Sequence, residues 1–400
     1  MSLKQLNRIG ILCYYHFPEG MAPTNRIIAY GKGLVQNGVQ CDVYIFRPRL
    51  STDIAPEDGY ISGVHYRYAY TRNSQVSLFR KILVDRPMSL IRTLQIIRRE
   101  HRKKAFDTIF LSFDSLPFLF VFVPILRLMG LSLTFIGDEY PIPIRQKLKS
   151  RLPLWKIVCY KVVFLGIHLR ILMTEALKEF FNTKISKKTS HILPTITDVD
   201  RFLSIGNSER PSMPYYICYM GNMELSKDNV DNIIAAYAIF VKKHPQIELH
   251  LYGTPSSKDY DTIRDQIQNL NLIDKIIFKG RADYEVVPSI LAGSILLVTS
   301  QPLTKRAEGG FPTKLGEYLM SGKPTILTNV GELAKYITDG QNAYMVEPCN
   351  PRIYADKMEY IIEHYDEALQ VARKGKEYIQ KYFNPQYVSA NLKQFLETNL

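Results

Sequence analysis

The chain has 400 residues, of which 46% are hydrophobic and 22% are charged, so it is long and apolar enough for two core-building domains and is not disordered. Its formal net charge of +13 indicates an anionic partner, which could be nucleic acid, an acidic membrane surface or a phosphorylated substrate. The five cysteines are widely spaced without a C-x-x-C pair, which argues against a disulfide framework or a zinc site. With no signal-peptide pattern at the N-terminus, these features favour a reducing, cytoplasmic location.

The first predicted elements form a β-loop-α-β unit. Arg8–Tyr15 is an apolar run of strand length, and Cys41–Phe46 supplies the next strand. The helix between them is expected to begin at a Thr24 cap and to end near Asn37. Ligands of parallel sheets lie beyond the carboxyl ends of the strands, so the loop Gly20–Arg26 is predicted to border a binding cleft.

Two stretches in the first half of the chain combine basic and apolar residues. Residues 77–104 hold nine lysines and arginines among leucine, isoleucine and phenylalanine, and Arg145–Met173 repeats the pattern around the only tryptophan, Trp155. Such helices can lie on an anionic membrane surface; a solvated helix face, and for Trp155 a core position, are the alternatives. Leu116–Gly130 is predicted to be a buried helix, because Arg127 and two prolines interrupt its apolar run before it could span a bilayer.

Acidic residues follow one of the buried strands in this half. The strand predicted at Leu131–Ile136 leads into Asp138 and Glu139, at the same sheet edge as the loop Gly20–Arg26. Either carboxylate could orient an incoming hydroxyl group, with Asp138 as the better candidate for a catalytic acid or base. A helix cap or turn acid is the alternative.

Two further patterns are interpreted as structural. Gly31 and Gly33 form only a G-x-G without a strand directly before it, so they are predicted to be helix-packing positions and not a dinucleotide fingerprint. Asp198 and Asp200 have the spacing of a metal-binding pair, but they lie in the extended link Thr189–Phe202, remote from any strand end. The sequence therefore predicts no metal site.

The second half of the chain repeats the alternation of strands and helices. Tyr215–Met220 is a strand, and Lys227 follows it in a loop. The later elements are predicted at Ile247–Tyr252, Asp261–Asn269, Ile276–Phe278, Tyr284–Leu291 and Ile295–Val298. This order predicts a second doubly wound α/β sheet, with Lys227 at its ligand-binding edge. Lys227 is then either a group that binds phosphate or an ordinary surface lysine.

The stretch Ala307–Pro324 turns a glycine loop into a helix. Gly309 and Gly310 let the backbone approach a ligand closely, and a helix of about three turns is expected from Pro312 to Gly322. The free N–H groups at the start of such a helix can bind phosphate. Glu317, on the flank of the helix, is either a solvated residue or an acceptor of hydrogen bonds from a diol.

The sequence Gly-Phe-Pro-Thr-Lys-Leu-Gly-Glu-Tyr-Leu-Met-Ser-Gly-Lys-Pro at residues 310–324 resembles the retaining glycosyltransferases of the GT-B fold, also called group 1 or family 4-like, and the resemblance covers nearly the whole chain. In that family a lysine at the place of Lys227 contacts the donor phosphates, and a glutamate at the place of Glu317 binds the donor ribose. The resemblance implies a donor-binding set of Glu317, Gly310, Phe311, Pro312, Thr313, Asn222, Lys314, Gly20 and Arg26, with Lys227 and Asp138 as catalytic residues.

Asn222 stands where the family often has an arginine. The family's first glutamate would fall on Gly309, one position after Glu308. Asp138-Glu139-Tyr140-Pro141 looks like the family's Asp-x-Trp-Pro loop.

The resulting expectation is an α/β enzyme of the GT-B type with two Rossmann-like domains facing across a cleft. Residues 1–205 would bind the acceptor, 206–380 the nucleotide sugar, and 381–400 would form a helix that returns to the first domain. The enzyme would transfer a hexose from a nucleotide-diphosphate sugar to a saccharide or lipid-linked acceptor with retention, in bacterial polysaccharide or glycolipid synthesis, without a metal or other cofactor. It would be cytoplasmic, with peripheral contact to an anionic membrane. The alternatives are a sugar-nucleotide epimerase of the same architecture and a basic nucleic-acid-binding protein.

Overall fold

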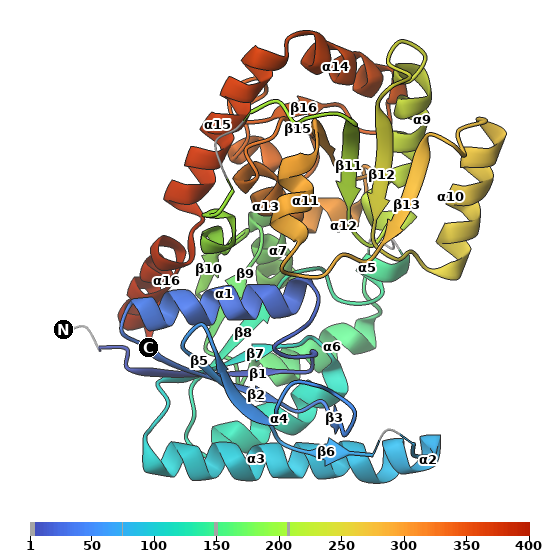
Figure 1. Ribbon diagram of the computed structural model, residues 1–400. Coiled ribbons are helices and arrows are strands. Elements are labelled where there is room, and N and C mark those ends of the chain that lie inside the picture. The colour runs from blue at the N-terminus through green and yellow to red at the C-terminus, as the bar shows by residue number, and fades with distance from the viewer. Residues whose placement is uncertain (1–4, 74, 148–150, 206–208) are drawn as a thin grey trace. The chain divides into compact units, whose positions relative to one another are not determined.

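A computed structural model describes residues 5–73, 75–147, 151–205 and 209–400. The contacts within the chain define two compact units, coloured along the chain in Figure 1. Unit 1 comprises residues 1–196 and 384–400, and unit 2 comprises residues 197–383. The first boundary thus lies earlier than residue 205, and the chain returns to unit 1 for its last helix.

Unit 1 is built on a sheet that has eight strands among the described residues. All neighbouring strands are parallel except β4 and β5, which are antiparallel. In their order across the sheet, the strands are β10 (Ser190–Ile192), β9 (Leu169–Leu172), β8 (Leu133–Gly137), β7 (Thr108–Ser112), β1 (Arg8–Cys13), β2 (Gln40–Ile45), β5 (Val64–Tyr68) and β4 (Asp58–Ile61). The central strands β1, β7 and β8 are buried along their whole length, as their continuous apolar sequences predict.

Helices cover both faces of this sheet, with α1 (Ala22–Gln36) above the strands and α3 (Arg86–Lys103) below them in Figure 1. The remaining elements of unit 1 are β3 (Arg49–Leu50), β6 (Thr71–Arg72), α2 (Leu78–Arg80), the π-helical turn η1 (Lys81–Asp85), α4 (Leu116–Leu128), α5 (Ile144–Lys147), α6 (Leu154–Phe164), α7 (Glu175–Phe180), the π-helical turn η2 (Phe181–Ile185) and α16 (Pro385–Asn399).

Three expectations for this half need correction. Thr24 does not cap α1: the helix begins after Met21, and the Thr24 hydroxyl donates to the carbonyl of His16 over 2.7 Å, which closes the preceding loop. The helix α4 is buried on one face only, because Leu128 is 88% exposed. Trp155 is 61% exposed on α6, which excludes the core position.

Unit 2 has a six-stranded parallel sheet among its described residues. The strand order is β13 (Ile276–Gly280), β12 (Glu248–Tyr252), β11 (Tyr216–Met220), β14 (Leu296–Val298), β15 (Thr325–Thr328) and β16 (Tyr344–Val346). The helices are α8 (Leu225–Asp228), α9 (Val230–Phe240), α10 (Ser257–Asn269), α11 (Val287–Gly293), α12 (Lys305–Gly309), α13 (Lys314–Met320), α14 (Pro351–Glu363) and α15 (Tyr365–Tyr382), with the 3₁₀ turns η3 (Val199–Phe202) and η4 (Leu333–Lys335).

The helix α16 packs against α1 at a glycine. A Cβ atom on Gly33 would lie 2.1 Å from the carbonyl oxygen of Pro385, so only glycine allows this approach. Hydrogen bonds extend the contact: Asn37 Nδ2 donates to the Gln386 carbonyl over 2.9 Å, and Lys393 Nζ to the Asn37 carbonyl over 2.9 Å. The prediction that Gly33 is a helix-packing position is thereby confirmed.

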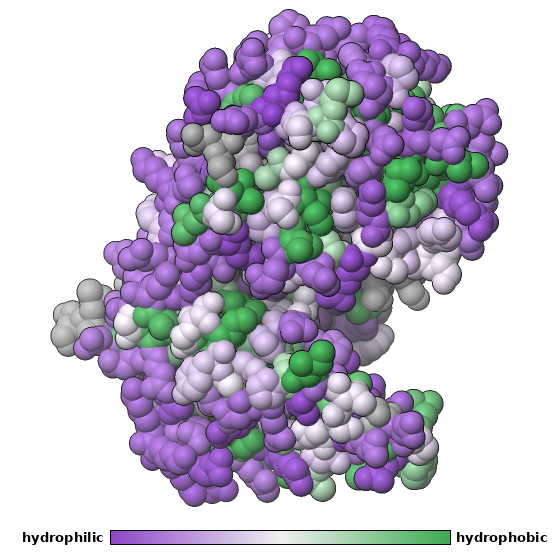
Figure 2. All heavy atoms as spheres, viewed as in Figure 1, coloured by the Kyte–Doolittle hydropathy of each residue, from purple (hydrophilic) through white to green (hydrophobic). Residues whose placement is uncertain are grey.

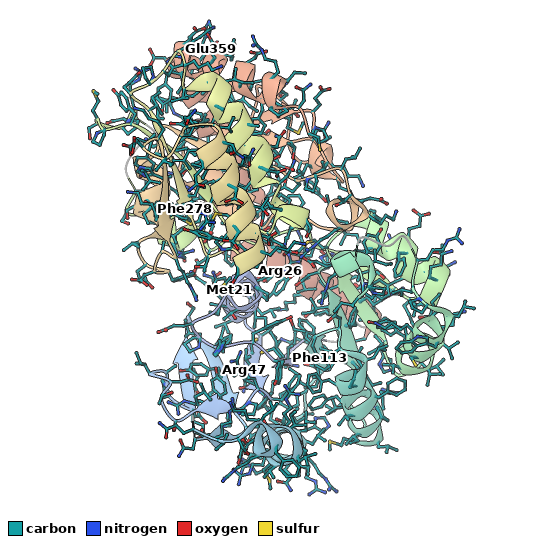
Figure 3. The ribbon with its side chains drawn as sticks, turned by 90° about the vertical axis from the view of Figure 1, so that its right-hand side faces the viewer. Met21, Arg26, Arg47, Phe113, Phe278 and Glu359 are labelled. Atoms are coloured by element: carbon teal, nitrogen blue, oxygen red, sulfur yellow. The ribbon has the colours of Figure 1, made fainter. Side chains whose placement is uncertain are left out.

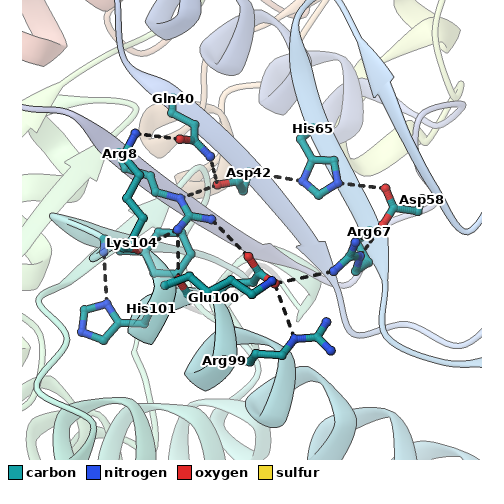
Figure 4. Close-up of polar contacts among 12 residues, drawn as sticks. Arg8, Gln40, Asp42, Asp58, His65, Arg67, Arg99, Glu100, His101 and Lys104 are labelled. Carbon is teal, nitrogen blue, oxygen red and sulfur yellow. Dashed lines mark hydrogen bonds and ion pairs between the residues drawn. The ribbon is translucent and has the colours of Figure 1, made fainter.

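A polar network fixes the amino ends of the central strands of unit 1 (Figure 4). Asp42 accepts from Arg8 Nε over 2.8 Å and lies 3.0 Å from His65 Nδ1, whose Nε2 is 2.9 Å from Asp58. Burial raises the pKa of Asp42, but the hydrogen bonds from His65 and Arg8 outweigh it, and the net shift is downward. The hydrogen bond to Asp42 raises the pKa of His65 against the opposing effect of burial, and Asp58 adds to the rise.

This network predicts a stability that depends on pH through His65. A histidine whose pKa is higher in the folded state stabilises the protein below its unfolded pKa of about 6.5, and the contribution is lost as pH rises through the folded value. We expect His65→Gln to cost on the order of 1 kcal/mol at pH 5.5 and much less at pH 9, measured by denaturant unfolding. An equal cost at both pH values would show that the imidazolium charge contributes nothing.

Candidate functional site

The unit 2 sheet has its topological switch point between β11 and β14. These strands are parallel neighbours, with Ile217 opposite Leu296, and the order continues to β12 on one side and to β15 on the other. Loops that leave the carboxyl ends of two such strands run in opposite directions and leave a crevice for a ligand. The loop after β11 carries Asn222, and Lys227 follows on the short helix α8, not in a loop as predicted; the chain after β14 leads to α12 and α13. The segments after β11 and after β14, in which the sequence predicted ligand-binding residues, therefore leave neighbouring strands at one edge of the sheet.

The glycine stretch differs from the prediction in its local structure. Glu308 and Gly309 lie in the short helix α12, not in a loop, and Glu308 is paired with Lys305 on the same helix at 2.5 Å. The chain is non-helical only from Gly310 to Thr313, and α13 then spans seven residues, two turns where about three were expected. Gly322, with φ of +69°, follows its end as predicted.

Lys314, the first residue of α13, is held inside unit 2. Its Nζ donates to Asp228 Oδ1 over 2.7 Å and to the Tyr219 hydroxyl over 3.2 Å, and it lies 4.5 Å from the centre of the Tyr219 ring. A Cβ atom on Gly221 would lie 2.5 Å from this ammonium, so glycine at that position gives the lysine its space. Because Asp228 is buried, the charge of Lys314 is compensated within the protein and serves first to anchor α13.

The hydroxyl of Tyr318 ties the same helix to β11. It donates to the carbonyl of Met220 and accepts from its N–H, at 3.3 and 2.7 Å. Phe311, 8% exposed, packs edge-on to Tyr336 with ring centres 5.4 Å apart. Phe311 therefore supports the turn as part of the core, while the backbone from Gly310 to Thr313 remains at the sheet edge.

Glu317 already has a partner, which the sequence did not suggest. Arg201 Nη1, on η3, donates to Glu317 Oε1, and Arg201 Nη2 donates to the carbonyl of Tyr284. The guanidinium also lies 3.4 Å above the centre of the Tyr284 ring. The Arg201 side chain is 10% exposed and that of Glu317 is 29% exposed. Arg201 thus fixes one carboxylate oxygen of Glu317 and leaves the side chain accessible to a ligand.

The other candidates at this edge are exposed. Lys227 lies on α8 and Asn222 in the loop before it, and both side chains are exposed. Arg306 on α12 pairs with Glu224 of the same loop, which joins the segments that follow β11 and β14. Lys314 and Arg306 both pair with carboxylates of unit 2, Asp228 and Glu224.

Within unit 1, Asp138 follows β8 as predicted, and Arg26 lies on α1 close to Met21, where the helix begins (Figure 3). Arg26 Nη2 is 3.4 Å from Asp138 Oδ1. The guanidinium also donates to the carbonyls of Leu193 and Pro194 and to the Tyr30 hydroxyl, at 2.7, 3.1 and 2.8 Å. Arg26 is therefore buried, and its guanidinium bonds to groups of unit 1. The donor contact expected of Arg26 stays a prediction. The turn itself requires a glycine at position 20, because a Cβ atom on Gly20 would lie 2.1 Å from Thr24 Oγ1.

The analysis of the sequence missed a cluster beside Asp138. Asp114 follows β7, the strand next to β8, and Arg145 lies between Asp114 and Glu139, with Nη1 3.1 Å from Asp114 Oδ2 and Nε 3.8 Å from Glu139 Oε2. Burial, together with the charges of Asp138 and Asp114, raises the pKa of Tyr15, so its phenol keeps its proton. The rule that selected Asp138, an acid directly after a buried strand, also applies to Asp114.

Asp198 and Asp200 lie at the start of η3, where Asp198 precedes the turn. Within the described ranges, no group of three or more histidine, cysteine, aspartate or glutamate side chains could hold a metal ion.

Comparison with known proteins identifies the class. Over 98% of both chains, the structure superposes on sucrose-phosphate synthase from Thermosynechococcus elongatus with a TM-score of 0.76 at 16% identity. It also superposes on Anabaena HepE in complex with UDP-glucose, with a TM-score of 0.68 at 14% identity and coverage of 98% and 99%. The chain therefore has the GT-B fold, with two Rossmann-like units. Residues 200–378 match the family model of glycosyl transferases group 1, so this part of the chain is similar to that family.

Curated relatives match part of the chain. Mannosylfructose-phosphate synthase of Agrobacterium fabrum is 25% identical over 176 residues, 41% of this chain and 38% of the relative. Poly(ribitol-phosphate) alpha-N-acetylglucosaminyltransferase of Staphylococcus aureus is 25% identical over 189 residues, 47% of this chain and 36% of the relative. The match thus spans less than half the length of these relatives.

Replacing the two lysines of the site should have different effects on stability and on nucleotide binding. Lys314→Met leaves the buried Asp228 without its partner and should lower the free energy of unfolding by about 3 kcal/mol or more. Lys227→Met removes an exposed side chain and should change it by less than about 1 kcal/mol while weakening nucleotide binding. Denaturant unfolding and calorimetric titration with UDP and GDP would measure both; similar unfolding curves for the two variants would contradict the anchoring role of Lys314.

Proposed function

We propose that the protein is a glycosyltransferase that moves a sugar from a nucleotide-diphosphate donor to a hydroxyl acceptor, with retention of configuration. Unit 2 binds the donor and unit 1 contributes acceptor-binding groups. The observation that carries the proposal is the switch point between β11 and β14, where the exposed Lys227, the backbone of Gly310–Thr313 and the accessible Glu317 belong to a part of the chain that matches the group 1 family.

The chemistry of transfer requires stabilisation of the leaving diphosphate. When the bond from the anomeric carbon to the phosphate oxygen breaks, negative charge builds up on the diphosphate, and a fixed cation or N–H group aimed at it lowers the barrier. Lys227 supplies that cation. Lys314 supports it indirectly by holding α13, and thus the Gly310–Thr313 backbone, against β11.

In unit 1, Asp138 is the group proposed to orient the acceptor hydroxyl. Its side chain is 31% exposed and ion-paired with the buried Arg26, so it is held in place and remains accessible to a hydroxyl group. Its neighbours Asp114 and Arg145 add polar groups suited to sugar hydroxyls. The acceptor is a saccharide or lipid-linked saccharide of a bacterial polysaccharide or glycolipid, and contact with an anionic membrane belongs to the same proposal.

The ribose contact of Glu317 has a specific test. We expect the wild type to bind UDP or GDP more tightly than the matching 2′- or 3′-deoxy nucleotide, because the missing hydroxyl leaves the Glu317 carboxylate with one hydrogen bond fewer. Glu317→Gln should lose most of this discrimination, on the order of 1–3 kcal/mol in binding free energy, measured by calorimetric titration.

Glu308→Gln is the matched control, because Glu308 is the other carboxylate of this stretch and pairs with Lys305. It should discriminate as the wild type does. If Glu308→Gln loses the discrimination and Glu317→Gln keeps it, the assignment moves to Glu308.

The activity itself is tested by release of nucleoside diphosphate from UDP-glucose, UDP-N-acetylglucosamine and GDP-mannose, with and without a panel of saccharide acceptors. Release that requires the acceptor supports transfer, whereas interconversion of the sugar without acceptor would identify an epimerase. We expect excess EDTA to leave the rate within about a factor of two, and Lys227→Ala to lower it on the order of a hundred- to a thousand-fold. Loss of the rate in EDTA that Mg²⁺ or Mn²⁺ restores would overturn the metal-free mechanism.

A further inference from the structure

The elements α2, η1 and α3 follow one another without a break from Leu78 to Lys103, along the lower edge of unit 1 in Figure 1. The fully buried residues at the N-terminal end of this long helix are polar, whereas Ile97, further along, is a buried apolar residue. Asp85, Ser89 and Thr93 are buried there. Asp85 accepts from the Tyr70 hydroxyl over 3.1 Å, and Ser89 Oγ donates to the Phe46 carbonyl over 2.8 Å. Ordinary amphipathic helices pack on a protein through an apolar stripe, so the polarity of this one is inverted at its N-terminal end.

The opposite side of the same end is apolar and exposed. The exposed fractions are 71% for Leu78, 71% for Phe79, 44% for Ile82, 56% for Leu83, 45% for Val84, 38% for Met88 and 51% for Ile91. Green spheres at the lower right of Figure 2, over α2, show part of this surface. We call these seven residues the apolar patch. Contiguous exposed apolar side chains of this number are uncommon on a monomeric protein and mark a surface that binds something.

The outer stripe changes from apolar to basic along the helix. Val84, Met88 and Ile91 continue at helical spacing into Gln95, Arg98 and Arg102. Gln95, Arg98, Arg99, Arg102 and Lys103 line a shallow groove of about 350 Å³. We call these five residues the basic groove.

The charge of this segment is almost entirely positive. Residues 77–104 contain nine lysines and arginines and only two acids, Asp85 and Glu100. Asp85 is buried, and Glu100, whose side chain is 16% exposed, faces Arg8, Arg67, Arg99 and Lys103. Glu100 offsets Arg99 and Lys103 in part, and Asp85 offsets Arg80, but nine cations against two acids leave residues 77–104 with a net charge of +7.

We propose that this helix docks the protein on a bilayer that contains anionic phospholipid, with the apolar patch in the interfacial region and the basic groove on the lipid phosphates. The inference rests on the membrane contact proposed above and names the element that makes it. An interfacial helix combines these two properties, apolar residues to enter the headgroup boundary and arginine or lysine to bind anionic headgroups. No described helix is both long and apolar enough to cross a bilayer, so the contact is peripheral along this helix.

Vesicle sedimentation in the absence of sugar nucleotide tests the proposal. We expect the protein to pellet with vesicles of phosphatidylglycerol and phosphatidylcholine at low salt and to stay in the supernatant with phosphatidylcholine alone. Phe79→Ser/Ile82→Ser/Leu83→Ser should weaken binding at least tenfold through lost apolar contact, and Arg98→Gln/Arg99→Gln/Arg102→Gln at least tenfold through lost charge.

Unit 2 supplies matched controls. Leu270→Ser/Ile273→Ser/Val286→Ser removes three apolar side chains of similar exposure, and Arg373→Gln/Lys374→Gln/Lys381→Gln removes three exposed charges from α15. Both should bind vesicles within about threefold of the wild type. Thermal denaturation and titration with UDP and GDP verify that each variant is folded.

Three outcomes would overturn the docking surface: no pelleting of the wild type with anionic vesicles, equal binding by the helix variants, or an equal loss in the controls. A dimer in sedimentation velocity that Phe79→Ser/Ile82→Ser/Leu83→Ser converts to a monomer, without vesicle binding, would assign the patch to a second copy of the chain. If the protein does not bind vesicles but still binds UDP or GDP, only the docking surface is contradicted and the proposed donor site is not. If it binds vesicles but transfers no sugar, only the enzymatic proposal is contradicted.

Discussion

The buried ion pair between Lys314 and Asp228 is the interaction on which the candidate site depends. It joins the start of α13 to the end of α8, and the Tyr318 hydroxyl fixes the same helix to the end of β11. A buried carboxylate is stable only with a partner, so the pairing of Asp228 with the partly buried Lys314 specifies where α13 lies relative to the sheet. The non-helical segment Gly310–Thr313 is positioned as a result, because it has a packed helix on each side.

A second constraint comes from the link that enters unit 2. Arg201 on η3 holds the carboxylate of Glu317 and stacks on Tyr284, so three segments distant in the sequence meet at one side chain. Two cations of the site, Arg201 and Lys314, therefore pair with carboxylates of unit 2, and a third, Lys227, is exposed.

The sequence was sufficient for the strands β1, β2, β8 and β11 to β14, because continuous apolar runs with glycine or proline breaks mark them. The strands β4, β5, β9, β10, β15 and β16 were not predicted. It also placed Lys227 and Asp138 after the carboxyl ends of strands and Glu317 on a helix, where the structure has them. It could not reveal that Lys314 and Arg26 are engaged inside their own units, since Asp228 and the carbonyls of Leu193 and Pro194 approach them only in the folded chain. The short helix α12 was missed because two adjacent glycines resemble a loop, although Thr304 caps it through the N–H of Ala307. Arg201 carried no periodic or motif signal.

The return of residues 384–400 to unit 1 has a consequence for how the chain folds during synthesis. The helix α16 fills the surface of α1 at Gly33, so unit 1 is discontinuous in sequence while unit 2 is continuous. All of unit 2 is translated before the residues that complete unit 1, and α1 stays uncovered during that interval. Loss of a few residues at the C-terminal end would therefore expose apolar surface in the half of the molecule that is synthesised first.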